Sequence, residues 1–388
     1  MEGDLIKINE WLLPFSWIYG IGVKVRNALF DMGILKSKSY DVPVICIGNI
    51  TVGGTGKTPH TEYLIKLLSE KYKVAVLSRG YKRKSEGYVL ADANTPMEMI
   101  GDEPYQMKQK FEQVYVAVDK NRRRGIERLC ADKATADTDV ILLDDAYQHR
   151  YVKPGVNILL VDYHRMIGED KLLPAGRLRE PSRGKDRAHI VIVTKCPADI
   201  KPMGFRVLQK ALHLYPYQKL FFSTFKYGKM SQLFGSEERN LATLRLDEHI
   251  LLLTGIASPE QMRMDLERYT KNITSLAFGD HHFFDEKDVA QINEAFAQIK
   301  AKEKIIITTE KDATRLRNTK GLSEAVKEAI FVLPIEVEIM QDQKDSFNEK
   351  ILSYVLKNSR NSVLAKSKDA DNPRYSHHPG NRIRKIGR

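Results

Sequence analysis

A glycine-rich stretch near the N-terminus has the residue types that bind phosphate groups. GNITVGGTGKTP (48–59) follows an apolar run and precedes a helical pattern. In such a loop, backbone N–H groups and the positive helix end hold phosphates, while Lys57 reaches the β- and γ-oxygens and the Thr58 hydroxyl ligates Mg²⁺. Residue 51 is threonine where G-x-x-x-x-G-K-[ST] has glycine, but two glycines follow and keep the backbone free to turn. The predicted nucleotide-binding residues are Thr51, Val52, Gly53, Gly54, Thr55, Gly56, Lys57 and Thr58.

Carboxylates end a later apolar run, VILLDD (140–145). In a nucleotide-binding protein, Asp144 or Asp145 would hold Mg²⁺ opposite Thr58, directly or through water. Acidic residues that simply end a strand are the alternative, and the phosphate-binding loop favours the metal role.

Two segments offer a proton acceptor for a substrate hydroxyl group. GDEP (101–104) contains Asp102 and Glu103, and FGDHHF (278–283) contains Asp280, His281 and His282. An aspartate close to a histidine is suited to this chemistry, because each charge tunes the other. Taken singly, Asp102 is typical of a turn. Adjacent histidines point to opposite sides of an extended chain, so at most one lies in the site, and the spacing does not decide which.

A basic loop, residues 172–187, contains Arg177, Arg179, Arg183, Lys185 and Arg187. Guanidinium groups recognise phosphate well, so the loop is a candidate for binding an anionic substrate. A solvated basic loop is the alternative.

The elements that position these residues are short β-branched runs that alternate with helical patterns. VPVICIG, KVAVLS, VYVAV, DVILLD, VNILLVD and HIVIVT predict a parallel sheet covered on both faces, a doubly wound α/β fold. Polar residues follow the strands and should meet at the carboxyl edge of the sheet. The alternation of strands and helices stops over residues 216–247, which we expect to be a connector. It resumes over 248–356, which predicts a smaller α/β domain. This domain includes the strand AIFVLPIEV and a helix capped by Asp285.

Both ends of the chain are unusual in composition. Residues 11–23, WLLPFSWIYGIGV, predict either an interfacial helix with Trp11, Phe15 and Trp17 in lipid or a helix packed on its own domain. The tail 357–388 contributes +7 of the net charge of +12, and its composition predicts disorder. The three cysteines lie far apart without a C-x-x-C pair, which excludes a disulfide framework and a zinc site.

The motifs taken together resemble the tetraacyldisaccharide 4'-kinase family, the lipid A 4'-kinases of Gram-negative bacteria. They are GNITVGGTGKTP, SRGYKR, GDEP, DDAYQHR, LLPAGRLREP, TKCP, FGDHHFF and TEKDATRL, in the family's order up to about residue 355. The family has Ser or Thr at the place of Thr51, so the altered loop is a family trait. Ala146 and Tyr147 stand where the family often has glycine and phenylalanine.

The resemblance implies transfer of the γ-phosphate of ATP, with Mg²⁺, to the 4'-hydroxyl of a lipid A disaccharide 1-phosphate. The enzyme would be a peripheral monomer at the cytoplasmic face of the inner membrane, with no specific nucleic acid partner. The implied catalytic residues are Asp102, His281, Lys57 and Asp145; the metal ligands Thr58, Glu103 and Asp144; and the substrate-binding residues Tyr81, Arg122, Gln148, His149, Arg179 and Glu180.

The implied fold is a P-loop NTPase-like α/β/α sandwich (1–215), a short β linker (216–247), a second smaller α/β/α domain (248–356) and a basic tail (357–388). The sequence has three rival interpretations. A GTPase would need an aspartate where TKCP has Pro197, and a partition-type ATPase would need a lysine at the place of Val52. A non-enzymatic nucleic-acid or membrane adaptor would depend on the tail and the aromatic N-terminus.

Overall fold

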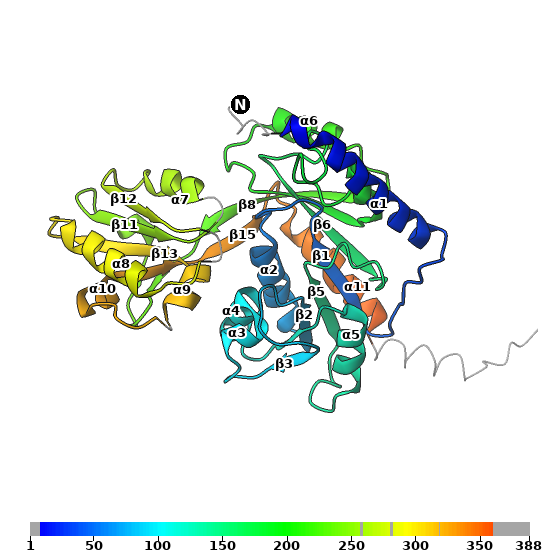
Figure 1. The fold of residues 1–388 in the computed structure, drawn as a ribbon, viewed down its shortest axis with the longest axis horizontal. Helices are drawn as coiled ribbons and strands as arrows, with labels where there is room; N and C mark the ends of the chain where they lie inside the picture. Colours follow the sequence, from blue (N-terminus) through cyan, green and yellow to red (C-terminus); the bar gives the residue numbers. More distant parts are fainter. Residues whose placement is uncertain (1–7, 257–258, 280–281, 318, 360–388) are drawn as a thin grey trace, which may run out of the picture.

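The computed structural model describes residues 8–256, 259–279, 282–317 and 319–359, which form two lobes, each built on one sheet (Figure 1). The larger sheet has nine strands in the order β15-β8-β7-β6-β1-β5-β2-β4-β3. Strands β8 to β4 in this order are parallel, and β15 and β3 are antiparallel edges. The bounds are β1 (Val44–Gly48), β2 (Val74–Ser78), β3 (Val89–Ala91), β4 (Tyr115–Val118), β5 (Val140–Asp144), β6 (Val156–Asp162), β7 (Ile190–Thr194), β8 (Lys219–Tyr227) and β15 (Ile335–Ile339). All six predicted runs are strands of this sheet, which confirms the predicted parallel architecture.

Helices cover both faces of the larger sheet, because alternate residues of each strand point to opposite sides. Ile45 and Ile47 share a core with α2 (Lys57–Ser69), α4 (Asp102–Lys110) and α11 (Lys344–Asn358). Val44 and Cys46 share a core with α5 (Arg122–Ala131), and α6 (Pro202–Leu212) covers β6 to β8 on that side. Short helices α3 (Met97–Ile100) and η2 (Ser182–Arg187) lie in the connections. The fold is an α/β/α sandwich, as predicted.

The smaller lobe has a six-stranded sheet in the order β10-β9-β14-β13-β11-β12. Its strands are β9 (Met230–Gln232), β10 (Glu238–Arg239), β11 (His249–Thr254), β12 (Ile273–Ala277), β13 (Lys304–Thr309) and β14 (Ile330–Leu333). Helices α8 (Glu286–Gln298), α9 (Glu310–Leu316) and α10 (Glu324–Ala329) pack on one face, and α7 (Pro259–Leu266) and η3 (Leu241–Thr243) on the other. The predicted cap is confirmed: the Asp285 carboxylate accepts backbone N–H groups of α8.

Three details differ from the predicted division of the chain. The segment 216–247 supplies β8 to the larger sheet and β9 and β10 to the smaller one. AIFVLPIEV is two strands, because Pro334 lacks the N–H needed to continue a ladder: β14 stays in the smaller sheet and β15 returns to pair with β8. Helix α11 packs in the larger core through Phe347, Ile351 and Val355.

The N-terminal helix α1 (Leu13–Asp31), preceded by η1 (Glu10–Leu12), lies on the outside of the larger lobe (Figure 1). Its Ser16 hydroxyl donates to the Leu172 carbonyl at 2.9 Å, and Tyr19 donates to the Arg179 carbonyl at 2.7 Å. Trp11 and Trp17 are 91% and 70% exposed. The helix therefore packs on its lobe through Ser16, Gly20 and Phe30, while Trp11 of η1 and Trp17 of α1 stay uncovered. Within the described parts of the chain, none of the helices is both long and apolar enough to span a membrane.

Candidate active site

The glycine-rich loop connects the end of β1 to the start of α2. Gly53 and Gly56 have φ angles of 114° and 80°, which side chains disfavour. A Cβ atom at Gly56 would also lie 2.7 Å from the Phe225 ring. The Asn49 amide donates to the Thr55 hydroxyl at 2.8 Å and fixes the two ends of the loop to each other. The loop thus has the tight, hydrogen-bonded backbone turn that is typical of phosphate-binding loops.

Thr51 occupies a position with no need for glycine. It forms an antiparallel bridge with Leu178, is 5% exposed, and accepts a hydrogen bond from Asn49 at 3.4 Å. Extended backbone of this kind suits a β-branched residue. The next amide, that of Val52, donates to the Arg177 carbonyl at 2.7 Å and is directed to the protein. The first part of the loop is therefore held by the basic loop, and the glycines after it form the exposed turn.

Asp144 lies at the end of β5, beside β1 in the sheet. Its carboxylate is 1% exposed and accepts hydrogen bonds from Ser78 and Thr61, each at 3.1 Å. Burial, followed by the charges of Glu103 and Asp145, raises the pKa of Asp144 to about 7. This carboxyl group therefore changes protonation near neutral pH in the absence of a cation.

Asp145 has the opposite electrostatic environment. Its left-handed backbone, with φ of 44°, places the carboxylate 3.7 Å from the Lys57 ammonium and 3.5 Å from the Arg179 guanidinium. Burial alone would raise the pKa of Asp145, but the positive charges of Lys57, Arg179 and Arg122 outweigh burial and lower it. Asp145 thus stays ionised and holds the loop lysine at the carboxyl edge of the sheet.

The predicted metal ligands supply oxygen atoms only. Glu103 interacts electrostatically with Asp144, and Thr58 is the second residue of α2, directly after Lys57. Among the residues that the structure describes, no three His, Cys, Asp or Glu side chains converge as a metal cluster. Two carboxylates and a hydroxyl are nevertheless a fitting set for Mg²⁺, which takes few protein ligands and completes its shell with water and phosphate oxygens.

The predicted base lies where the two lobes meet. Asp102 is the first residue of α4, and both Nε and Nη2 of Arg315 in α9 donate to its Oδ2 atom, at 3.2 and 2.5 Å. Asp280 and His281 lie outside the described residues, so the structure leaves the predicted pairing of Asp102 with His281 as a prediction. His282 is placed: its Nε2 lies 2.7 Å from Asp288, and its ring stacks on Phe278. The His282 side chain is therefore held against the first turn of α8, just before that helix begins.

The residues predicted to bind substrate fall into two groups. Arg179 faces Asp145, and Tyr81 is 59% exposed. Arg122, in contrast, is 2% exposed and donates to the carbonyls of Asp119 and Asp144, so it joins the ends of β4 and β5.

Gln148 and Glu180 also form internal contacts. The Gln148 amide donates to the Asn49 carbonyl at 2.7 Å and to Glu180 at 3.1 Å, and Glu180 accepts from Arg187 at 2.9 Å. These contacts connect the phosphate-binding loop to the basic loop. His149 lines a hollow of about 520 Å³ together with Phe30 of α1, and burial lowers its pKa to about 4.

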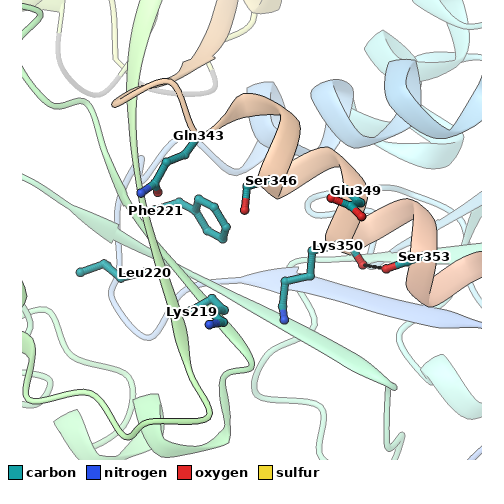
Figure 2. A pocket seen from close by; sticks show the side chains of 8 residues that line it. All are labelled: Lys219, Leu220, Phe221, Gln343, Ser346, Glu349, Lys350 and Ser353. Carbon is teal, nitrogen blue, oxygen red and sulfur yellow. Dashed lines mark hydrogen bonds between the residues drawn. The ribbon is translucent and has the colours of Figure 1, made fainter.

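A second hollow, of about 370 Å³, lies between β8 and α11 (Figure 2). Lys219 and Phe221 line it from the strand, and Ser346 and Lys350 from the helix. The predicted site residues do not line this hollow. The predicted nucleotide site is instead the edge of the sheet where Lys57, Asp144 and Asp145 meet.

Sequence reasoning missed several residues that position this edge. Thr61 holds Asp144, Asn49 holds the loop, and Arg315 holds Asp102. Ser78, which ends β2 and is expected at the carboxyl edge of the sheet, does lie there and donates to Asp144. Arg315 lies in the motif TEKDATRL, which marked it as a candidate without indicating a role. Its contact with Asp102 joins residues 213 positions apart, which spacing along the chain does not reveal.

Comparisons with known proteins agree over nearly the whole chain. The sequence model of the family described as "Tetraacyldisaccharide-1-P 4'-kinase" matches residues 8–356. A protein of Phocaeicola vulgatus named "Tetraacyldisaccharide 4'-kinase" is 60% identical over 363 residues, covering 93% of this chain and 99% of its own. A protein of the same name from Bacteroides fragilis (strain ATCC 25285) is 56% identical, and the match covers 95% of this chain and 99% of that protein. Another, from Porphyromonas gingivalis (strain ATCC 33277), is 43% identical, and the match covers 91% of this chain and 99% of that protein.

Among solved structures, an "apo" form of LpxK from Aquifex aeolicus in complex with ATP superposes with a TM-score of 0.67 at 28% identity. The match covers 89% of this chain and 98% of that one.

Proposed function

The chain belongs to the tetraacyldisaccharide-1-P 4'-kinase family, and on that premise we propose that it transfers the γ-phosphoryl group of ATP to the 4'-hydroxyl of a tetraacylated lipid A disaccharide 1-phosphate. The observation that carries this proposal is the meeting of Lys57 with Asp145 beside the buried Asp144, at the carboxyl ends of β1 and β5. This arrangement suits a triphosphate and its cation.

In this proposal, the loop 51–58 binds the phosphates of ATP through its exposed part, from Gly53 onward, while Thr51 and Val52 hold the start of the loop to Leu178 and Arg177. Lys57 would contact the β- and γ-oxygens. Thr58, Glu103 and Asp144 would hold Mg²⁺, which when bound neutralises charge on the phosphates. Asp144 fits this role because burial and neighbouring carboxylates hold back its ionisation until a cation compensates them. Asp145 would keep Lys57 oriented, and Lys57 would move from this carboxylate toward the phosphates.

The transfer would need a proton acceptor on the second substrate. The Asp102 carboxylate would take the proton of the 4'-hydroxyl, whose oxygen forms a bond to the γ-phosphorus as the bond from that phosphorus to the β–γ bridging oxygen breaks. ADP then leaves, and the lipid carries the 4'-phosphate. His281 would orient Asp102. Because the transition state of phosphoryl transfer is loose, positioning and electrostatic stabilisation contribute more than base strength.

The lipid would approach from the side of α1. Trp11, Phe15 and Trp17 are exposed and would enter the cytoplasmic face of the inner membrane, so that the enzyme would be a peripheral protein that meets both ATP and its lipid. We propose that it acts as a monomer. Tyr81 and Arg179 would contact the substrate, while Arg122, Gln148, His149 and Glu180 would position them.

The nucleotide base is expected to be adenine rather than guanine. Lys195 of TKCP lies 2.7 Å from Asp162 at the end of β6, and Pro197 stands where a guanine-binding aspartate would be. Both facts weigh against a GTPase.

The test is transfer of label from [γ-³²P]ATP to a tetraacyl disaccharide 1-phosphate in mixed micelles. We expect labelled product with ATP, far less with GTP, and loss of transfer in Lys57→Ala. Lys66→Ala, an exposed lysine of the same helix, is the matched control. A folded wild-type protein that labels no disaccharide would refute the proposed function.

A further inference from the structure

Helices α4 and α9 face each other across the two lobes with an ion pair at each end. Asp102 begins α4 and pairs with Arg315 near the end of α9, while Lys110 ends α4 and pairs at 2.6 Å with Glu310 at the start of α9. The two helices therefore run antiparallel. The two acidic residues lie at the N-terminal ends of their helices and the two basic residues at the C-terminal ends. The helix dipoles therefore stabilise all four charges in addition to the ion pairs.

Arg315 is built into the smaller lobe as a rigid cation. Its side chain is 1% exposed, and Nη1 donates to Asp312 at 3.1 Å. Asp312 is itself fully buried and accepts the Gly255 amide at 2.9 Å and the Thr309 hydroxyl at 2.7 Å. A guanidinium held in this way keeps little freedom to follow its partner, so it fixes the position of whatever it binds.

The contacts of Arg315 fix the orientation of the Asp102 carboxylate. Two N–H groups of Arg315, those of Nε and Nη2, donate to the same oxygen, Oδ2. Because the guanidinium group is planar and is itself held by Asp312, this pair of hydrogen bonds sets the position of Oδ2 relative to the smaller lobe.

We propose that Arg315 is a positioning residue for phosphoryl transfer: it reaches from the smaller lobe to hold the Asp102 carboxylate in place and aim it at the acceptor hydroxyl. This inference rests on the proposed function, in which Asp102 is the base. It gives the motif TEKDATRL a role, which is to place the Arg315 guanidinium beside Asp102 of GDEP. The approach of the two lobes thereby sets the orientation of the base.

The experiment compares Arg315→Ala, Arg315→Lys and the control Arg317→Ala, an exposed arginine two residues further along. We expect Arg315→Ala to lower kcat about 100-fold, as misplacement of a reacting group does, with KM for ATP changed less than about threefold. Arg315→Lys should lie closer to wild type than Arg315→Ala does, and added guanidinium should restore part of the activity of Arg315→Ala. Arg317→Ala should behave as wild type, and thermal melting checks that each variant is folded.

A double-mutant cycle separates positioning from a general structural role. In an Asp102→Ala background, Arg315→Ala should cause no further fall in kcat, because the residue through which Arg315 acts is gone. An equal loss in both backgrounds, or an unchanged kcat in Arg315→Ala, would overturn the inference. Wild-type protein without kinase activity would instead refute the proposed function, so the two failures are distinguishable.

Discussion

Replacing Asp144 with asparagine should stabilise the nucleotide-free protein while abolishing its activity. The carboxyl group is 1% exposed, and its pKa is raised from 3.8 to about 7, first by burial and then by the charges of Glu103 and Asp145. Asparagine carries no charge to bury. It can also retain both contacts, because the hydroxyl groups of Ser78 and Thr61 can donate to its oxygen or accept from its NH₂ group.

The size and sign of the effect follow from linkage. A pKa higher by about 3 in the folded state corresponds to about 4 kcal/mol at about 1.4 kcal/mol per pKa unit. We expect about 2 kcal/mol in practice, because charged sites in proteins behave as if their dielectric were higher than that of a dry interior. Between pH 4 and 7, folded Asp144 keeps a proton that the unfolded chain has released, so wild-type stability falls as pH rises through this range. The advantage of Asp144→Asn should be absent near pH 4 and complete above about pH 8.

Thermal melting from pH 4 to 8.5 measures this difference, with Asp199→Asn, an exposed aspartate, as the control. A gain of about 2 kcal/mol raises Tm by about 2–3 °C in a chain of 388 residues, since the entropy of unfolding grows with chain length. Mg-ATP should raise the Tm of wild type more than that of Asp144→Asn, because the variant lacks the carboxylate that we propose as a metal ligand. A variant that melts below wild type at pH 8, or a difference in Tm that does not vary with pH, would refute the reasoning.

Three further predictions concern Asp102, Lys110 and the tryptophans of η1 and α1. Asp102→Asn should lower kcat by about 100-fold or more, with nucleotide affinity unchanged in a fluorescent-nucleotide titration. Lys110→Ala should lower the free energy of unfolding by about 1–3 kcal/mol at pH 8, because it removes the ammonium group 2.6 Å from the Glu62 carboxylate, which is 7% exposed. This loss of stability should shrink as pH falls, since burial and then the charge of Glu310 raise the pKa of Glu62. Replacing Trp11 and Trp17 with serine should reduce sedimentation with anionic liposomes.

Each of these predictions has a matched control and a contrary outcome. Unchanged turnover in Asp102→Asn would place the base elsewhere. For Lys110→Ala, the exposed Lys66→Ala serves as the comparison, and equal stability of the two variants in urea would contradict a buried ion pair of any consequence. Tyr215→Ser removes an exposed aromatic residue outside α1. If it reduces sedimentation as much as the tryptophan changes do, binding is not specific to this helix.

The sequence was sufficient for the larger sheet because buried parallel strands are near-continuous apolar runs. It was insufficient at the junction of the lobes. A sequence pattern reports on neighbouring residues, whereas the strand and helix contacts at this junction join residues that are far apart in the chain. AIFVLPIEV reads as one strand by composition, yet Pro334 divides it between two sheets. Helix α11 follows the smaller lobe in the chain, but Phe347, Ile351 and Val355 are covered by the larger one. Periodicity shows that a face is buried and does not show against which element.

The same distinction explains the site. Lys57 and Asp145 belong to motifs whose chemistry requires them to meet, so their contact could be predicted. The role of α4 could not, because it depends on three ion pairs between residues far apart in sequence. Lys110 joins Glu62 of α2 to Glu310 of the smaller lobe, and Asp102, at the opposite end of α4, binds Arg315. Since α2 begins with Lys57, the contacts of α4 connect the smaller lobe both to the proposed base and to the helix that carries the phosphate-binding loop. In the proposed mechanism, the contacts that bring the two lobes together therefore also set the base in place.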